Sequence, residues 1–111
     1  MKTEDNLKGR THEHKKIKIK DREADGYVIP LGPVNLVFAV TGKGLVGCGA
    51  FNVNALDKYG YPACKAKARD GSGISTLDDL LRAEIDQSNE ACSKSGIKPG
   101  MTVLEAIEKL I

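Results

Sequence analysis

The first periodic stretch of the chain alternates isoleucine with lysine. Ile17 and Ile19 each stand between lysines, which is the pattern of a half-buried strand. Asp25-Gly26 then predicts a turn, because glycine tolerates positive φ and aspartate can bond its own backbone. A second strand begins at residues 27–29 and is interrupted at Pro30, since proline has no N–H to donate to a sheet.

A central hairpin follows. Residues 34–40 are nearly continuously apolar and contain β-branched side chains, which favours a strand covered on both faces. Residues 41–44 (TGKG) predict a turn, and residues 45–53 predict the returning strand. Glycines inside that strand, Gly47 and Gly49, indicate a bulge or the close approach of another backbone.

Alternation returns at residues 63–69, where small residues take one side of a predicted strand and basic residues take the other. The basic residues are Lys65, Lys67 and Arg69. Asp70-Gly71-Ser72-Gly73 ends this strand.

Beyond residue 73 the period becomes helical. Ser75 or Thr76 can cap a first helix, and a second helical stretch is predicted at about residues 85–95. Thr102 and Glu105 have the spacing of a capping box and predict a last helix. Strands first and helices last indicate an α+β fold, in which a mainly antiparallel N-terminal β-sheet is followed by two or three C-terminal helices packed against it.

The 111 residues, of which 41% are hydrophobic and 29% charged, fit one small domain. We expect residues 1–15 to form a flexible charged tail and residues 16–111 to form a single α+β domain. A domain of this size leaves much of its surface unburied, so a partner subunit often completes its core. The sequence has no apolar run near the roughly 20 residues of a bilayer span. Its polar N-terminus does not resemble a signal peptide, so a cytoplasmic protein is expected.

Charge is segregated along the chain. Residues 1–22 and 58–69 each carry a net charge of +4, whereas residues 70–111 carry −4. Such polarity favours self-association between unlike faces, or a basic surface for an anion. A dedicated nucleic-acid binder would be more strongly basic, and the basic run at residues 15–22 has no aromatic residue for base stacking. Nucleic acid is therefore not an expected partner.

Residues 42–47 (GKGLVG) have the glycine spacing of a dinucleotide-binding fingerprint. That fingerprint requires a helix to begin directly after the glycines, so that its N–H groups meet a pyrophosphate. Residues 48–53 predict a strand instead, and the expected acid about 20 residues further on is missing. A hairpin turn explains these glycines better, and we expect no cofactor.

Cys48 stands between two glycines and is a candidate catalytic nucleophile. A thiolate needs a base, and the sequence holds only His12 and His14, both in the predicted tail. The alternative is a small buried hydrophobe at a tight strand crossing. Two histidines are too few for a structural zinc site, so no metal site is expected. The odd number and wide spacing of the three cysteines predict separate, reduced thiols.

Further polar residues are candidates for ligand binding. Two asparagines lie near opposite ends of the hairpin strands, where they could converge on a pocket or bond the local backbone. The basic strand leads into a glycine-rich segment and a predicted helix start, a combination that can hold a small anion. The alternative is a solvated strand face followed by an ordinary helix cap. The candidate ligand-binding residues are Asn35, Asn52, Lys65, Lys67, Arg69 and Ser72.

Five segments carry a family resemblance: residues 31–36 (LGPVNL), 43–51 (KGLVGCGAF), 76–81 (TLDDLL), 96–101 (GIKPGM) and 105–106 (EA). In this order they resemble the YunC-like family of bacteria and archaea, catalogued as a domain of unknown function (number 1805). The resemblance implies a domain with no assigned reaction and an N-terminal β region used for tetramerisation. Asn52 departs from the family, whose members carry aspartate there; if that acid is catalytic, the activity of this chain is in doubt.

The leading hypothesis is a self-associating small binding or structural protein, a dimer or tetramer assembled through its N-terminal sheet. The alternative is a small enzyme, or a protein that binds an anionic small molecule. Its pocket would lie near Cys48 and the strand that carries Lys65, Lys67 and Arg69.

Overall fold

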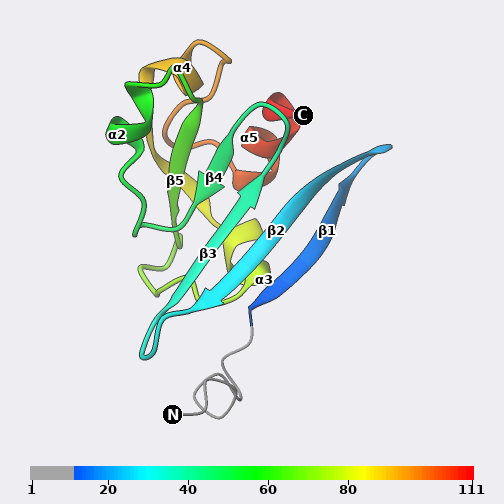
Figure 1. Ribbon diagram of the computed structural model, residues 1–111, viewed down its shortest axis with the longest axis vertical. Coiled ribbons are helices and arrows are strands. Elements are labelled where there is room, and N and C mark those ends of the chain that lie inside the picture. The colour runs from blue at the N-terminus through cyan, green and yellow to red at the C-terminus, as the bar shows by residue number, and fades with distance from the viewer. Residues whose placement is uncertain (1–11) are drawn as a thin grey trace.

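The computed structural model describes residues 12–111, and residues 1–11 of the predicted tail lie outside this range. Six strands form one open sheet in the order in which they occur along the chain. They are β1 (Glu13–Ile19), β2 (Arg22–Pro30), β3 (Asn35–Val40), β4 (Leu45–Gly47), β5 (Ala63–Lys67) and β6 (Glu84–Ser88) (Figure 1). All neighbouring strands are antiparallel except β4 and β5, which are parallel.

The described helices are α2 (Val53–Asp57), α3 (Leu77–Leu81), α4 (Glu90–Ser93) and α5 (Val103–Leu110). The predicted α+β class is confirmed, with a mainly antiparallel sheet and helices concentrated in the C-terminal half. The predicted capping box of Thr102 and Glu105 is present, and Thr76, one of the two predicted caps of the first helix, forms a second capping box with Asp79. These local signals fix where α3 and α5 begin.

The predicted turn at Asp25-Gly26 is wrong, because both residues lie inside β2. The chain turns instead after β1, where Lys20 has a φ of 60°. Gly26 is closely packed: a Cβ atom there would lie 2.8 Å from Cδ2 of Leu77 in α3, so the Leu77 side chain would have to shift. β1 also begins at Glu13, so residues 13–15 pair with β2 rather than belonging to a tail.

The strand predicted at residues 45–53 is much shorter, because β4 ends at Gly47. The N–H of Phe51 donates to the carbonyl of Cys48 at 3.3 Å, so the chain turns back at once. A Cβ atom at Gly47 would collide with the ring of Phe51, which explains the glycine. A helix, α2, then begins at Val53.

The helix predicted at about residues 85–95 is wrong in its first half, which belongs to β6; a helix, α4, occupies only Glu90–Ser93. Ile85 is fully buried and pairs with Ala66 of β5. Asn89 caps α4 by accepting a hydrogen bond from the N–H of Cys92. Pairing with a distant strand therefore overrides the helical pattern here.

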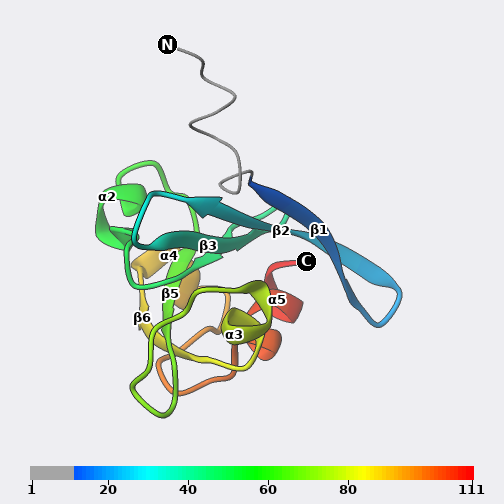
Figure 2. The ribbon, with the colours of Figure 1, turned by 90° about the horizontal axis from the view of Figure 1, so that it is seen from below.

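The main core lies between the sheet and helices α3 and α5, which occupy one side of it (Figure 2). A smaller cluster, Leu45, Val53 and Ala63, packs where α2 meets β5. All three cysteines are buried and free, as predicted for reduced thiols. None of the helices within residues 12–111 has both the length and the apolar character needed to span a bilayer.

Candidate functional site

The parallel strands β4 and β5 end side by side, and the chain segments that follow them diverge. Between these segments lies a cavity of about 370 Å³, which we call the crevice. Its lining comes from residues 48–50 after β4, residues 66–68 at the end of β5, and residues 71–74 of the next loop. Small-ligand sites are usually concave pockets of about 300–1,000 Å³, so the crevice is a candidate ligand site.

Cys48 lines the crevice but is only 5% exposed and belongs to the main core. Its N–H donates to the carbonyl of Val37 at 2.9 Å. The lining of the crevice contains no histidine. His14 lies in β1, where its Nε2 is 2.8 Å from the carboxylate of Asp25 and its ring stacks on Tyr27. The structure therefore gives the Cys48 thiol no histidine base within the described residues.

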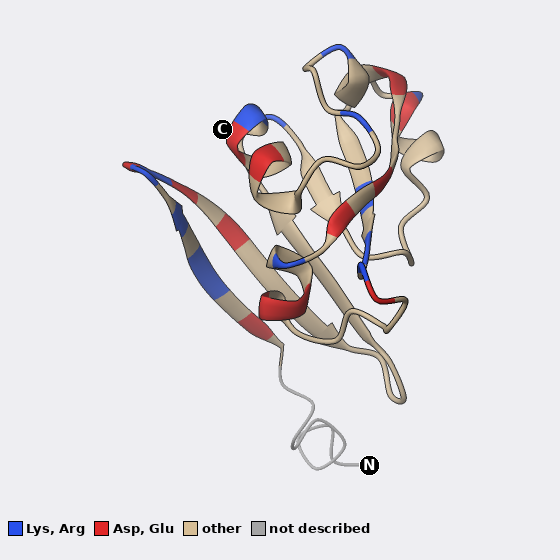
Figure 3. Cartoon of the chain, turned by 180° about the vertical axis from the view of Figure 1, so that it is seen from behind, with Lys and Arg blue, Asp and Glu red and all other residues tan. Residues whose placement is uncertain are grey.

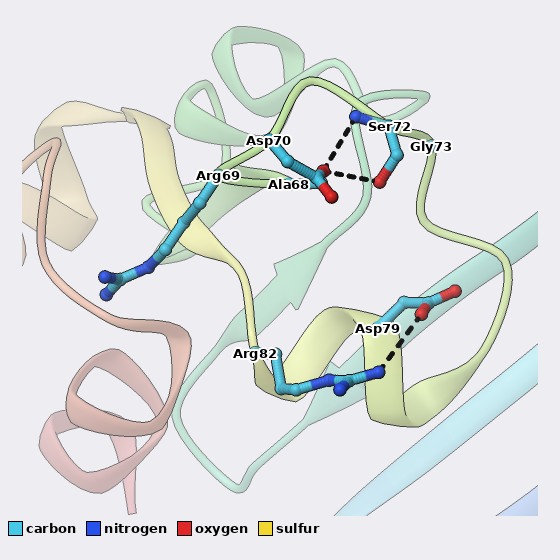
Figure 4. A pocket seen from close by; sticks show the side chains of 7 residues that line it. All are labelled: Ala68, Arg69, Asp70, Ser72, Gly73, Asp79 and Arg82. Carbon is cyan, nitrogen blue, oxygen red and sulfur yellow. Dashed lines mark hydrogen bonds and ion pairs between the residues drawn. The ribbon is translucent and has the colours of Figure 1, made fainter.

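The three predicted basic residues are divided between different places. Lys67 lines the crevice, and its Nζ lies 3.7 Å from the carboxylate of Asp86. Arg69 lines an adjoining depression of about 290 Å³, which we call the hollow (Figure 4). Lys65 is partly buried and lines neither. Ser72 lines both, so it marks the boundary between them.

The hollow holds charges of both signs. Arg82 pairs with Asp78 at 2.9 Å and approaches Asp79 at 3.8 Å, and Figure 4 shows Arg69 extending away from the Arg82–Asp79 pair. The N–H of Ser75 donates to Asp79 at 3.0 Å, and bonds of this kind lower the pKa of that carboxyl. Two guanidinium groups and two carboxylates, counting that of Asp70, thus line the hollow.

Asp70 engages the polar groups of Ser72. The Ser72 hydroxyl donates to the Asp70 carboxylate at 2.6 Å and the Ser72 N–H donates to it at 3.0 Å. These bonds lower the pKa of Asp70, with the hydroxyl making the largest contribution. The hollow is therefore nearly neutral, and its hydrogen-bonding groups largely satisfy one another.

Asn35 and Asn52 are used within the fold. The side-chain amide of Asn35 donates to the carbonyl of Ser75 at 2.9 Å and ties the start of β3 to the segment before α3. The side-chain oxygen of Asn52 accepts from the N–H of Ala55 at 3.1 Å and caps α2. Neither residue lines the crevice or the hollow.

The glycine pattern at residues 42–47 lies in the turn between β3 and β4 and in β4 itself. Gly44 packs directly against the backbone of Pro62, so this glycine of the pattern is explained by packing. Within residues 12–111, no three His, Cys, Asp or Glu side chains gather in a way that could hold a metal ion.

The sequence did not reveal a row of rings that crosses three strands. His14 stacks on Tyr27 at 4.6 Å between ring centroids, and Tyr27 stacks on Phe38 at 5.1 Å. Phe51 meets Phe38 edge-on at 5.3 Å. This row forms because His14, Tyr27 and Phe38 are register partners in β1, β2 and β3. Each strand alternates in sequence, but which residues become neighbours depends on the register.

We compared the chain with known proteins. A crystal structure of a protein of unknown function from Thermoplasma acidophilum is similar to it, with a TM-score of 0.80 and 29% sequence identity. The match covers 91% of this chain and 94% of that chain. No curated protein matches it. The family model described as Domain of unknown function (DUF1805) matches residues 47–110, a segment that includes the whole lining of the crevice. The chain therefore belongs to the DUF1805 family, with which the YunC-like resemblance agrees.

Proposed function

We propose that this protein is a self-associating domain whose copies, as a dimer or a tetramer, meet through one face of the N-terminal sheet. We call this surface the outer face. It comprises the side chains of β1, β2 and β3 that point away from α3 and α5: His14, Lys16, Lys18, Glu23, Asp25, Tyr27, Ile29, Leu36, Phe38 and Val40. The single observation that carries the proposal is the row of partly exposed aromatic and aliphatic side chains on this face.

The outer face has an apolar extension at the turn between β2 and β3. Leu31 is 52% exposed and Val34 is 60% exposed in that turn. Helices α3 and α5 pack on the opposite side of the sheet (Figure 2). On the outer face, α2 packs beside Phe38 and Val40 of β3, and no helix within residues 12–111 lies over β1 and β2. Contiguous exposed apolar side chains of this kind typically mark interaction surfaces.

At the centre of the outer face, Asp25 is paired with its cross-strand neighbours. The Asp25 carboxylate lies 2.7 Å from Nζ of Lys16 and 2.8 Å from Nε2 of His14. These bonds, above all that from Lys16, lower the pKa of Asp25 and keep it ionised. A second copy could therefore cover this part of the face without burying an isolated charge, which would be costly.

The edge of the sheet is a poorer contact surface than its face. β1 is the edge strand on the N-terminal side of the sheet, and lysines recur along it (Figure 3). Lysines on an edge strand oppose pairing with the same strand of another copy, because like charges would meet. We therefore propose contact face to face rather than an extension of the sheet from copy to copy.

Light scattering on the purified chain tests the proposal. We expect a mass of two or four chains at micromolar concentration. Val34→Asp places a charge in the exposed apolar turn and should shift the population toward the monomer. Leu104→Asp is the matched control, because Leu104 is 45% exposed but lies on α5, away from the outer face. A strictly monomeric wild-type protein would contradict the proposal, as would an equal effect of both variants.

We also propose that the protein works in the cytoplasm. Its three cysteines are all free and buried, a state that a reducing compartment preserves. Locating a tagged copy of the full chain in fractionated cells tests this directly.

A further inference from the structure

We propose that the crevice at the ends of β4 and β5 binds a small organic anion with a short apolar body, such as a short-chain carboxylate. The proposal does not depend on self-association, since the crevice and the outer face share no residue. Four features of the crevice support it: the glycines that line it, its free backbone donors, its charge and its size.

Two glycines of the lining are not required by the fold. A Cβ atom at Gly49 or Gly73 would meet no atom within 4 Å, and neither residue has a positive φ. Gly26 and Gly44 differ, because a Cβ atom there would collide with neighbouring residues. The absence of a side chain at these two positions lets a ligand in the crevice approach the backbone closely.

The same two glycines offer hydrogen-bond donors. Both are exposed, and their N–H groups donate to no acceptor among residues 12–111. The N–H groups of Cys48 and Gly71, by contrast, are bonded to the carbonyls of Val37 and Ala68. Free backbone donors on neighbouring loops are suited to carboxylate oxygens.

The side chains that line the crevice favour a negative charge. Lys67 is the one ionised side chain in the lining, and no carboxylate lines it, in contrast to the hollow. The Lys67 ammonium is 3.7 Å from Asp86, and both side chains are about half exposed or more. An exposed pair at this distance contributes little, so a bound anion can compete for the ammonium.

The crevice also limits the size and polarity of the ligand. Its apolar lining consists of small side chains and one isoleucine: Ala50, Ala66, Ala68 and Ile74. Its volume of about 370 Å³ lies near the low end for ligand pockets. A short aliphatic chain fits this lining, with its carboxylate toward Lys67 and the glycine N–H groups.

Titration of the full chain with propionate, followed by the shifts of backbone amide NMR signals, tests the proposal. We expect saturable shifts at Gly49, Gly73 and their neighbours. Propionamide has the same shape without the charge and should bind about tenfold more weakly or not at all. Lys67→Met keeps the aliphatic stem of the side chain and should weaken propionate binding by about tenfold.

Three alanine variants separate binding from folding. Gly49→Ala and Gly73→Ala should each weaken propionate binding by about fivefold or more, while the thermal midpoint stays the same or rises. Gly42→Ala is the matched control, because Gly42 also has open space around it and no positive φ but lies outside the crevice. It should leave propionate binding unchanged.

Several results would overturn the proposal. These are the absence of saturable shifts up to the highest propionate concentration, equal binding of propionamide, or shifts centred on the lysines of β1. Wild-type affinity in both Gly49→Ala and Gly73→Ala, with the chain still folded, would overturn it as well.

Discussion

The side-chain amide of Asn89 donates to the carbonyl oxygen of Val53 at 2.9 Å, although the two residues are 36 positions apart. The same amide donates to the carbonyl of Tyr61 at 2.9 Å. Its oxygen accepts from the N–H of Ala63 at 3.2 Å and from the N–H of Cys92 at 2.9 Å. One side chain, 2% exposed, thereby joins α2, the start of β5 and the start of α4.

We predict that Asn89→Ala lowers the free energy of unfolding by about 3 kcal/mol, because it leaves several buried backbone groups without partners. Urea denaturation measures the loss. Asn52→Ala removes a comparable helix cap at an exposed position and should cost only about 1 kcal/mol. Equal losses in the two variants would mean that the long-range bonds of Asn89 add nothing to its capping role.

The turn between β3 and β4 contains two glycines with opposite requirements. A Cβ atom at Gly44 would collide with the carbonyl oxygen of Pro62, which also accepts the N–H of Leu45 at 3.0 Å and so cannot move freely. A Cβ atom at Gly42 would meet nothing. We predict that Gly44→Ala lowers the free energy of unfolding by about 2 kcal/mol. Gly42→Ala should leave it unchanged or raise it slightly.

Calorimetry on both variants gives the comparison directly. A folded Gly44→Ala protein with the wild-type melting temperature would show that Pro62 yields easily. The segment that leads into β5 would then shift relative to β4 more easily than the close packing indicates.

Local signals in the sequence predicted local structure well. Thr102 and Glu105 bond each other's backbone within one helical turn, so four residues are enough to place the start of α5. The alternation of small and basic residues around Lys65 likewise predicted β5, because period two needs no knowledge of the neighbouring strands.

Errors arose where tertiary contact decides the outcome. Asp25-Gly26 has the composition of a turn, but it lies inside β2, where the side chain of Leu77, 51 positions away, packs closely on Gly26. Ile85 lies in a strand because β5 is available to pair with it. Neither partner can be identified from a short window of sequence.

The sequence suggested a pocket near Cys48 and the strand that carries Lys67, but not the strand pairing that forms it. Cys48, Lys67 and Ser72 were each identified from the sequence, and they line one crevice. That they meet depends on the parallel pairing of β4 with β5 across α2, which periodicity does not reveal. The same geometry places Arg69 in the hollow, beside carboxylates that the sequence could not assign to it.

The carboxyl of Asp79 should contribute to the acid sensitivity of the fold. The N–H groups of Ser75 and Thr76 donate to it, so its pKa in the folded state lies below the ordinary value of 3.8. The stabilisation is therefore fully present above that ordinary value and is lost as the pH falls through the lower folded pKa.

We predict that Asp79→Asn is less stable than wild type at neutral pH and loses less stability between about pH 5 and about pH 2. Urea denaturation across this range checks the difference in slope. Parallel pH profiles for the two proteins would show that Asp79 is not linked to folding.

The three thiols should differ in how they react. Cys64 and Cys92 are fully buried, whereas Cys48 is 5% exposed at the crevice. The neighbouring Cys92 thiol and burial both raise the pKa of Cys64, which further suppresses its reactive thiolate. With iodoacetamide and mass spectrometry, we predict that Cys48 is alkylated first. Once alkylation outpaces refolding at high reagent concentration, the alkylation rates of Cys64 and Cys92 should no longer depend on that concentration and should equal the rate of unfolding. Alkylation of Cys64 in proportion to reagent, faster than the chain unfolds, would contradict the closed packing of β5 against α4.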